Sequence, residues 1–197
     1  YMASQQLFQA SRIGLFAALA AGPKSVDAIA DDTGVSARMA RILADAMAAK
    51  GLLVRSGGTY ALAPDAATYL VDGKSEIDLA PFLTFLGEIS YPHWLQFSHT
   101  VDTTEPGELQ MDDARWATFM AGVMTYNRLH GQEFGRHVDL SGATHALDFG
   151  GLSPAFAIAA MRANPQLSMT FVYAEGLEGG IADALAEAGL SDRATVL

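Results

Sequence analysis

Apolar positions in the first 62 residues follow a helical period and then change to the pattern of a β-hairpin. Helices are expected over residues 2–21, 26–33 and 37–50, and hairpin strands over residues 52–55 and 59–62. Ser25 and Ser36 are suited to cap the second and third helices, and a glycine follows each of these helices. Three helices followed by a hairpin predict a winged helix-turn-helix domain.

A second apolar pattern runs from residue 64 to residue 136 and predicts further helices. Residues 79–101 are strongly apolar and aromatic, and residues 102–107 read as a polar loop. The long helix expected over residues 113–136 has apolar residues at steps of three and four, namely Trp116, Phe119, Met120, Val123 and Met124. These side chains build one continuous face, which the pattern alone assigns to the core.

The last third of the chain alternates strand and helix patterns. Residues 145–163 read as a short strand, a Gly150-Gly151 turn and an alanine-rich helix that begins near Pro154. A buried strand is expected over residues 167–173 and another helix over residues 181–188. Two successive βα units imply a parallel sheet with right-handed crossovers. In such a unit the glycines let a cofactor approach the backbone, and N–H groups at the helix start receive its polar groups.

The composition is that of a globular chain able to bury a core, with 50% hydrophobic and 17% charged residues in a length of 197. No apolar run approaches the roughly 18 residues of a membrane span, and the absence of cysteine excludes disulfides and thiolate chemistry. With no signal-like start, a cytoplasmic location is expected. The chain begins within a helical pattern and ends within a strand pattern, so we expect a fragment of a longer protein.

The net charge of -10 is unevenly distributed. Residues 1–75 carry seven basic and six acidic side chains, whereas residues 76–197 carry five basic and sixteen acidic ones. An acidic second half repels nucleic acid. A DNA-binding winged helix would use Arg38 and Arg41 of its third helix, but this helix offers few side chains that reach bases or phosphates. The pattern therefore favours dimerisation through the apolar first helix over DNA binding.

The glycine turn and its surroundings resemble a known family. The order Asp148-x-Gly150-Gly151, then Asn164-Pro165 and an apolar strand, is similar to motif I of the S-adenosylmethionine-dependent small-molecule O-methyltransferases. The front half resembles the winged-helix dimerisation domain of the same family. The resemblance implies an α/β protein with a mainly helical winged-helix dimerisation domain over residues 1–100, connecting helices over residues 101–140, and the first part of a Rossmann-like class I methyltransferase domain over residues 141–197.

Three positions depart from the motif of the family. Leu152 and Pro154 stand where the third and fourth glycines usually lie, and a leucine loses ready access to positive φ. An ungapped count places Tyr173 where an acidic residue usually binds the ribose hydroxyls, and the nearest carboxylate, Glu175, lies two residues further on. These departures leave open whether the turn still binds S-adenosylmethionine.

Carried over residue by residue, the resemblance implies two sets of binding residues. The cofactor-binding set comprises Asp148, Gly150, Gly151, Ser153, Tyr173, Glu175 and Thr125. The substrate-binding set comprises Trp94, Phe119, Met120, Met124 and Tyr126. As a large aromatic residue, Trp94 is expected in the core rather than in contact with a ligand, and only the resemblance places it in the substrate-binding set.

Neither a catalytic residue nor a metal site is assigned from the sequence. The catalytic base of the family is a histidine in the second half of the methyltransferase domain, which the resemblance places beyond Leu197. Histidines at 130, 137 and 145 lack metal-ligand spacing with nearby carboxylates, so each is expected to be a surface or structural residue.

The resemblance implies transfer of a methyl group from S-adenosylmethionine to a small aromatic or apolar hydroxylated metabolite, by a homodimer without nucleic-acid or membrane partners. One alternative is a methyltransferase fold with a degenerate cofactor site that runs other chemistry or only binds ligands. The other is a winged-helix transcriptional regulator, which binding to random duplex DNA at low salt would distinguish. The identity of the acceptor cannot be read from the residues.

Overall fold

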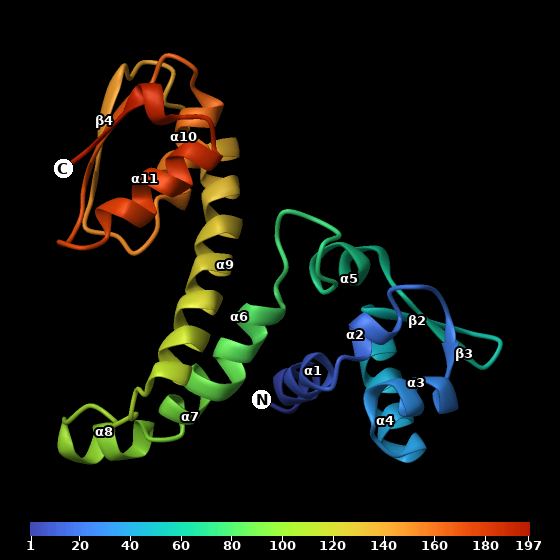
Figure 1. The fold of residues 1–197 in the computed structure, drawn as a ribbon. Coiled ribbons are helices and arrows are strands. Elements are labelled where there is room, and N and C mark those ends of the chain that lie inside the picture. The colour runs from blue at the N-terminus through green and yellow to red at the C-terminus, as the bar shows by residue number, and fades with distance from the viewer. The chain divides into compact units, whose positions relative to one another are not determined.

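The computed structural model describes all 197 residues, and its contacts divide the chain into two compact units, Tyr1–Thr125 and Tyr126–Leu197 (Figure 1). The long helix α9 (Asp113–His137) contributes its first half to one unit and its second half to the other. The expected domain boundaries near residues 100 and 140 remain a prediction. No helix combines the length and the apolar character needed to cross a lipid bilayer.

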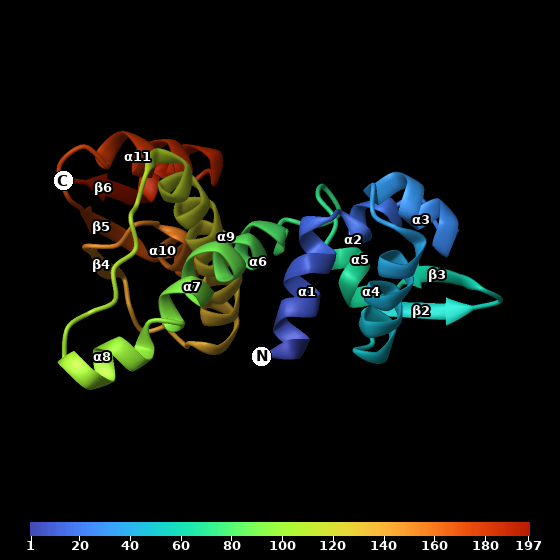
Figure 2. The same ribbon diagram turned by 90° about the horizontal axis from the view of Figure 1, so that it is seen from below.

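The first unit begins with helices and a small antiparallel sheet. Its elements are α1 (Met2–Arg12), α2 (Leu15–Ala18), β1 (Lys24–Ser25), α3 (Val26–Thr33), α4 (Ala37–Ala49), β2 (Leu53–Ser56), β3 (Thr59–Leu62) and α5 (Pro64–Tyr69). The hydroxyl oxygens of Ser25 and Ser36 cap α3 and α4, each accepting a hydrogen bond from a backbone N–H at 3.3 Å. The sheet order is β1-β3-β2, and Figure 2 shows the β2–β3 hairpin extending beyond α4. The helices and the hairpin thus follow the predicted order.

The first helix is shorter than the sequence predicts. Gly14 has a left-handed φ of 75° and separates α1 from α2, so residues 2–21 do not form one continuous helix. Beyond this break Leu15 and Phe16 are buried, with exposed fractions of 0% and 2%. The apolar spacing alone could not show the break, because the residues on both sides of Gly14 contribute to the same core.

The hairpin is fixed to α4 through one carboxylate. The hydroxyl of Tyr60 on β3 donates to Oδ1 of Asp45 on α4 at 2.5 Å, and Arg55 on β2 donates to the same oxygen at 3.2 Å. The Arg55 guanidinium also lies 5.6 Å from the centre of the Tyr60 ring. Burial raises the pKa of Tyr60, and the hydrogen bond to Asp45 adds to the rise. The hairpin therefore has a polar anchor beside the apolar core.

The first unit continues with a series of short helices packed along the first half of α9. They are α6 (Ala80–Phe85), the π-helical turn η1 (Leu86–Ser90), α7 (Tyr91–Trp94) and α8 (Phe97–Thr103). A Cβ built on Gly122 of α9 would lie 2.3 Å from Cβ of Phe85, so α6 approaches α9 where a side chain is absent. The ring of Phe85 meets the ring of Phe119 edge-on at 5.7 Å.

The second unit contains the two predicted βα units. Strands β4 (His145–Phe149), β5 (Ser168–Val172) and β6 (Ala194–Val196) form a parallel sheet in the order β4-β5-β6. The helices α10 (Ala155–Ala163) and α11 (Glu178–Glu187) lie in the two connections, and a 3-10 turn, η2 (Ser191–Arg193), precedes β6. The α/β class and the parallel pairing that the sequence predicts are confirmed.

The two faces of this sheet differ in burial. Met169, Phe171 and Tyr173 alternate along one face and belong to a core shared with α10 and α11. On the opposite face Leu147 and Phe149 of β4 are 60% and 76% exposed. The helices of this unit therefore cover one face of the sheet, and the carboxyl ends of β4 and β5 lie side by side at one edge of that core.

Arg193 closes the carboxyl end of α10 from a distant part of the chain. Its Nη1 donates to the carbonyl oxygens of Asn164, Pro165 and Leu167 at 2.9–3.0 Å, and its Nη2 donates to that of Met161 at 3.0 Å. The last carbonyl groups of a helix have no partner within the helix. The guanidinium supplies such a partner for Met161 and ties the segment 164–167 to the end of the helix.

Candidate functional site

The turn after β4 has an open glycine conformation. Gly150 has a φ of 73°, and no atom lies within 4 Å of a Cβ built on it. Leu152 is 44% exposed. The helix begins at Ala155, whose N–H donates to Oγ of Ser153 at 3.3 Å, and Pro154 occupies the position before it. The missing N–H of Pro154 therefore costs α10 no hydrogen bond within the helix.

Tyr173, the residue that follows β5, reaches back to this turn. Its hydroxyl lies 3.0 Å from Oδ2 of Asp148 and 3.3 Å from the carbonyl oxygen of Ser153, and it donates to these acceptors. The side chain is 8% exposed, and its ring lies 6.4 Å from the ring of Phe171. A Cβ built on Gly151 would lie 3.2 Å from the Tyr173 hydroxyl. Four of the predicted cofactor residues thus meet at one point.

Burial governs the protonation of the Asp148–Tyr173 pair. It raises the pKa of Asp148, while the hydrogen bond from Tyr173 acts in the opposite direction. Burial also raises the pKa of Tyr173, and the charge of Asp148 and the hydrogen bond between the two side chains raise it further. The phenolic proton therefore stays on Tyr173 at neutral pH, where it is donated to the Asp148 carboxyl group.

Besides Gly150, which lies in the same turn, two of the predicted cofactor residues, Glu175 and Thr125, are not part of this cluster. Glu175 is exposed in the loop after β5, where the N–H of Gly176 donates to Oε2 of Glu178 at 2.7 Å. Thr125 is half-buried on α9 and is the last residue of the first unit. The assignment of all seven residues to cofactor binding stays a prediction.

A groove of about 470 Å³ lies within the first unit. Its lining residues come from α6, η1, α7, α8, the loop that follows α8, and α9: Phe85, Ile89, Ser90, His93, Trp94, Phe97, Thr100, Pro106, Gly107 and Phe119. The ring of Trp94 lies 5.5 Å from that of Phe97, and the ring of Trp116 lies 5.4 Å from that of Phe119. Volume and aromatic lining are those of a small-molecule site.

The structure places the predicted substrate residues in different surroundings. Trp94 and Phe119 line the groove, and Trp94 is 66% exposed, so its interpretation as a core residue is wrong. Met120 and Met124 are half-buried on α9 and are not lining residues of this groove. Tyr126 lies in the second unit, where its ring stacks on that of His130 at 3.9 Å.

The groove has polar residues that the sequence analysis did not single out. Ser90, His93 and Thr100 are its polar side chains, and His93 is the titratable one among the lining residues. The sequence signal was weak, since His93 stands inside the apolar segment 79–101 without a partner at a recognisable spacing. A few polar groups in an aromatic pocket fix the orientation of a ligand.

One wall of the groove is held by a pair of hydrogen bonds. Nε2 of Gln96 donates to the carbonyl oxygen of Glu108 at 2.7 Å, and the N–H of Glu108 donates to Oε1 of Gln96 at 2.9 Å. A Cβ built on Gly107 would lie 2.9 Å from Cβ of Gln96, so the loop passes close to this side chain. Gln96 therefore fixes the loop that carries Pro106 and Gly107.

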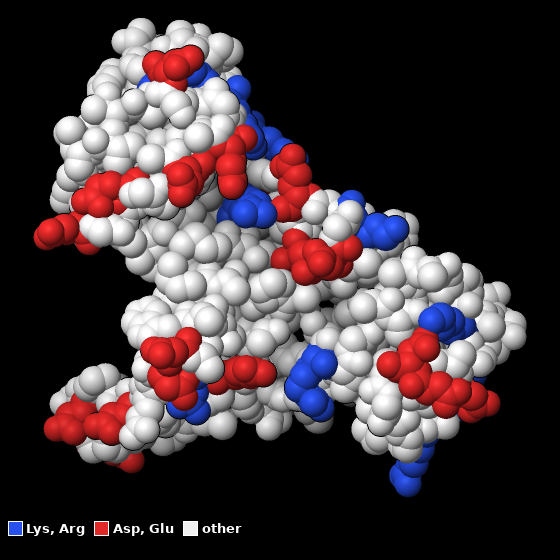
Figure 3. Space-filling model, viewed as in Figure 1, with Lys and Arg blue, Asp and Glu red and all other residues white.

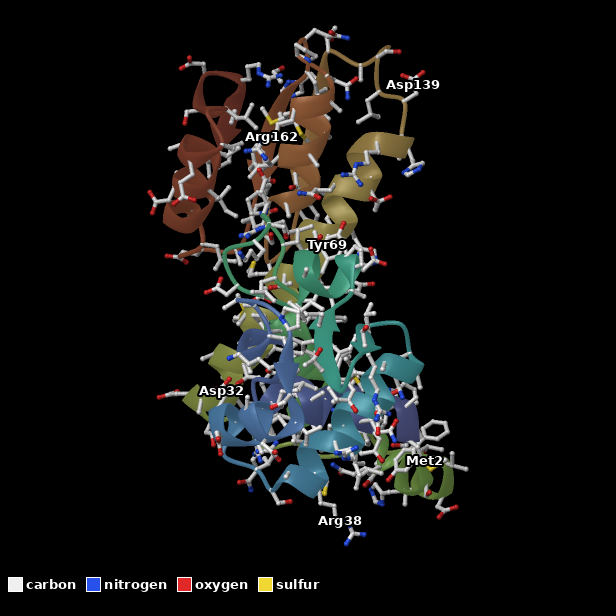
Figure 4. The ribbon with its side chains drawn as sticks, turned by 90° about the vertical axis from the view of Figure 1, so that its right-hand side faces the viewer. Met2, Asp32, Arg38, Tyr69, Asp139 and Arg162 are labelled. Carbon is white, nitrogen blue, oxygen red and sulfur yellow. The ribbon has the colours of Figure 1, made fainter.

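Charged residues do not form a basic surface on the helix that a DNA-binding winged helix would use. Arg38 and Arg41 of α4 are exposed, and Figure 4 shows the Arg38 side chain pointing away from the fold. Lys50, at the end of α4, donates to Oε1 of Gln6 at 2.7 Å. Figure 3 shows more acidic than basic side chains on the face in view. This distribution does not favour contact with a phosphate backbone.

Comparison with known proteins gives a family for the front of the chain. Residues 1–72 match the O-methyltransferase dimerisation domain. The chain is 31% identical over 198 residues to a 3-hydroxy-5-methyl-1-naphthoate 3-O-methyltransferase of Streptomyces sahachiroi, an alignment that covers 96% of this chain and 57% of that protein. It is 32% identical over 193 residues to the acetylserotonin O-methyltransferase of Mus musculus, covering 86% of this chain and 49% of that protein.

Solved structures agree on the fold. The human N-acetylserotonin methyltransferase in complex with SAM is similar with a TM-score of 0.77 at 23% identity, covering 100% of this chain and 61% of that chain. The present chain therefore spans about half to three fifths of the length of the proteins that it matches.

Proposed function

Because this chain belongs to the O-methyltransferases that carry an N-terminal dimerisation domain, we propose that the whole protein transfers a methyl group from S-adenosylmethionine to a hydroxyl group of a small aromatic metabolite. The observation that carries the proposal is the open glycine turn at the carboxyl end of the first parallel strand, Gly150 having a φ of 73°. This is the edge of a parallel sheet where nucleotide cofactors bind in α/β proteins.

The residues at the turn fit an adenosyl cofactor in part. Gly150 leaves open space beside the backbone, and Gly151 and Ser153 continue the turn up to the start of α10. We infer that these three residues hold the cofactor and that the helix start favours its polar groups. When bound, the cofactor supplies an electrophilic methyl group on a sulfonium. Of the three departures that the resemblance implies, at Leu152, Pro154 and Tyr173, the last offers a phenol in place of a carboxylate.

We infer that the groove in the first unit takes the acceptor. The proteins similar to this chain include methyltransferases for a hydroxynaphthoate and for acetylserotonin, both of which are aromatic acceptors. Phe85, Trp94, Phe97 and Phe119 give the groove faces on which a flat ring can stack. His93 is placed to bind a polar substituent of such a ring, which would orient the hydroxyl that receives the methyl group.

We further propose a homodimer formed through the N-terminal domain, because residues 1–72 match a dimerisation domain. Static light scattering on the protein made from its complete reading frame should give twice the mass of one chain. A monomer at micromolar concentration would contradict this assignment.

The experiment that tests the proposed activity is a calorimetric titration of S-adenosylmethionine and S-adenosylhomocysteine into the protein made from its complete reading frame. Binding at micromolar or lower Kd is expected. The variant Gly151→Val, whose Cβ would lie 3.2 Å from the Tyr173 hydroxyl, should bind at least about tenfold more weakly. Gly142→Ala is the matched control, because no atom lies within 4 Å of a Cβ there. Absence of heat from a folded wild-type protein would favour a fold that has lost the cofactor.

A further inference from the structure

We propose that Tyr173 is a positioning residue that holds the glycine turn to the end of β5 through Asp148 and Ser153, and that it is not the group that receives the ribose hydroxyls. The proposal rests on the proposed function only in taking the turn to be the cofactor site. It concerns the position at which the resemblance to the family implies a carboxylate and this chain has Tyr173.

The hydroxyl of Tyr173 is already hydrogen-bonded to the protein. Its hydroxyl has one proton and two acceptors within reach, Oδ2 of Asp148 at 3.0 Å and the carbonyl oxygen of Ser153 at 3.3 Å. The ring is anchored in the core, with 8% of the residue exposed. The single proton of the hydroxyl is engaged on protein acceptors before any ligand arrives, and the phenol offers one acceptor oxygen on a buried ring where a carboxylate would offer two.

The two acceptors of Tyr173 lie at opposite ends of the glycine turn. Asp148 lies in β4, Ser153 lies in the turn just before α10, and Tyr173 follows β5. The backbone at the start of this turn is tied to β5 by the Gly150 N–H, which donates to the Val172 carbonyl oxygen at 2.9 Å. Tyr173 adds a second tie at the far end of the turn. The two ties fix the turn on both sides of Gly151.

The phenol of Tyr173 also fills the space beside Gly151. A Cβ built on Gly151 would lie 3.2 Å from the Tyr173 hydroxyl and 3.5 Å from its Cε1. The phenol therefore packs directly against the turn. An ionised carboxylate has no ring to fill this space and no proton to donate to Asp148 and Ser153. The substitution exchanges a ligand acceptor for a structural support.

The burial of the pair agrees with this role. Burial raises the pKa of both Asp148 and Tyr173, so neither side chain ionises as readily as it would in water. A partly buried carboxyl group is stabilised by a donor, and the Tyr173 hydroxyl supplies one. Removing that donor would leave Asp148 without the hydrogen bond described here.

The first test needs no ligand. Hydrogen exchange of the backbone N–H groups of residues 148–155 is compared among the wild type, Tyr173→Phe and the control Tyr69→Phe, whose residue lies on α5 (Figure 4). Exchange in this segment should rise about tenfold in Tyr173→Phe and stay unchanged in Tyr69→Phe, because the hydrogen bonds to Asp148 and Ser153 are lost only in the former. Unchanged exchange in Tyr173→Phe would overturn the proposal, whether or not the protein binds the cofactor.

The second test separates support of the turn from direct contact with the ribose. Kd values of S-adenosylhomocysteine and of its 2′-deoxy analogue are measured by calorimetry for the wild type and Tyr173→Phe. A positioning role weakens both ligands by the same factor, about tenfold. If the loss disappears with the 2′-deoxy ligand, Tyr173 contacts the ribose and the proposal is wrong. A wild type that binds neither ligand refutes the proposed function, and the exchange experiment then still decides the role of Tyr173.

Variants of Asp148 complete the test. Asp148→Asn keeps an oxygen that can accept a hydrogen bond from Tyr173. Its backbone N–H groups over residues 148–155 should therefore exchange at the rate of the wild type. Asp148→Ala removes one of the two acceptors of the Tyr173 hydroxyl, so backbone exchange should rise no more than in Tyr173→Phe. The double variant should show the same exchange as Tyr173→Phe alone, because that change already removes both hydrogen bonds. Additive effects of the two changes would contradict a shared support of the turn.

Discussion

Gly131 of α9 lies so close to α10 that a Cβ built on it would come within 2.7 Å of the carbonyl oxygen of Ala155. One turn further along, a Cβ on Gly135 would lie 2.9 Å from the carbonyl oxygen of Ala159. The obstacles are backbone atoms, which cannot rotate away as the end of a side chain can. The two helices of the second unit therefore pack with backbones in contact.

The variant Gly131→Ala should destabilise the protein. Alanine gains up to about 1 kcal/mol of helix propensity over glycine, but overpacking against a backbone carbonyl costs about 1–3 kcal/mol, and the second effect is expected to win. Chemical unfolding should therefore show a lower midpoint with an unchanged slope. Gly180→Ala in α11 is the matched control, since no atom lies within 4 Å of a Cβ there, and it should leave the stability equal or higher. A stabilised Gly131→Ala protein would mean that α9 and α10 can separate freely.

Arg193→Ala should destabilise the second unit by about 2–3 kcal/mol. The carbonyl groups of Met161 in α10 and of Asn164, Pro165 and Leu167 just after it would lose this donor. Arg193→Lys should recover only part of the loss, because an ammonium group cannot reproduce the planar fork. Thermal unfolding measures the effect. Arg162→Ala, at an exposed arginine of α10, is the control and should change the melting temperature little (Figure 4).

Alkaline pH should reduce the contribution of Tyr173 to stability. The pKa of Tyr173 is raised in the folded state, whereas an unfolded tyrosine has a pKa of about 10. The folded state thus binds the proton more tightly, and stability falls as pH rises above about 10. The difference in unfolding free energy between the wild type and Tyr173→Phe should narrow over this range. Urea unfolding at pH 8 and at pH 11 measures this difference in unfolding free energy, with Tyr69→Phe as the control. An equal difference at the two pH values would contradict a raised pKa of Tyr173.

His93→Phe should weaken binding of the acceptor and leave binding of the cofactor unchanged. The change keeps the aromatic lining of the groove but removes its titratable polar group. The expected loss is about 10-fold in KM for an aromatic acceptor that carries a polar substituent, as for one lost hydrogen bond. Leu95→Ala, at a residue that is 66% exposed and outside the lining, is the control. Equal KM values for the wild type and His93→Phe would place the acceptor elsewhere.

The sequence predicted the fold because its signals are local. Ser25 and Ser36 mark helix starts, because each caps a backbone N–H only three residues further on. Gly150-Gly151 marks the turn after a strand, because the positive φ of Gly150 is a property of that residue alone. The break at Gly14 could not be predicted from spacing, because a glycine is tolerated within a helix and only the core decides whether the helix stops there.

The candidate site was less predictable, because its contacts join distant parts of the chain. Asp148 and Tyr173 are 25 residues apart, and nothing in either segment shows that the Tyr173 hydroxyl donates to the carboxyl group of Asp148 on the preceding strand. The size and apolar character of Trp94 predict a core residue, yet its side chain is exposed and lines the groove. The residue type predicts whether a side chain tends to be buried, but the packing of the helices decides which apolar side chains stay exposed in a groove where a ligand can bind.

The position of Arg193 gives the second unit an order of assembly. Its guanidinium reaches a carbonyl group 32 residues earlier in the chain, at Met161. During synthesis, α10 and β5 are complete long before this side chain exists. The end of α10 must then be hydrated or frayed until η2 has been made and docks against it. The last turn of an early helix is thus completed by a late residue, and the first βα unit reaches its full stability only together with the second.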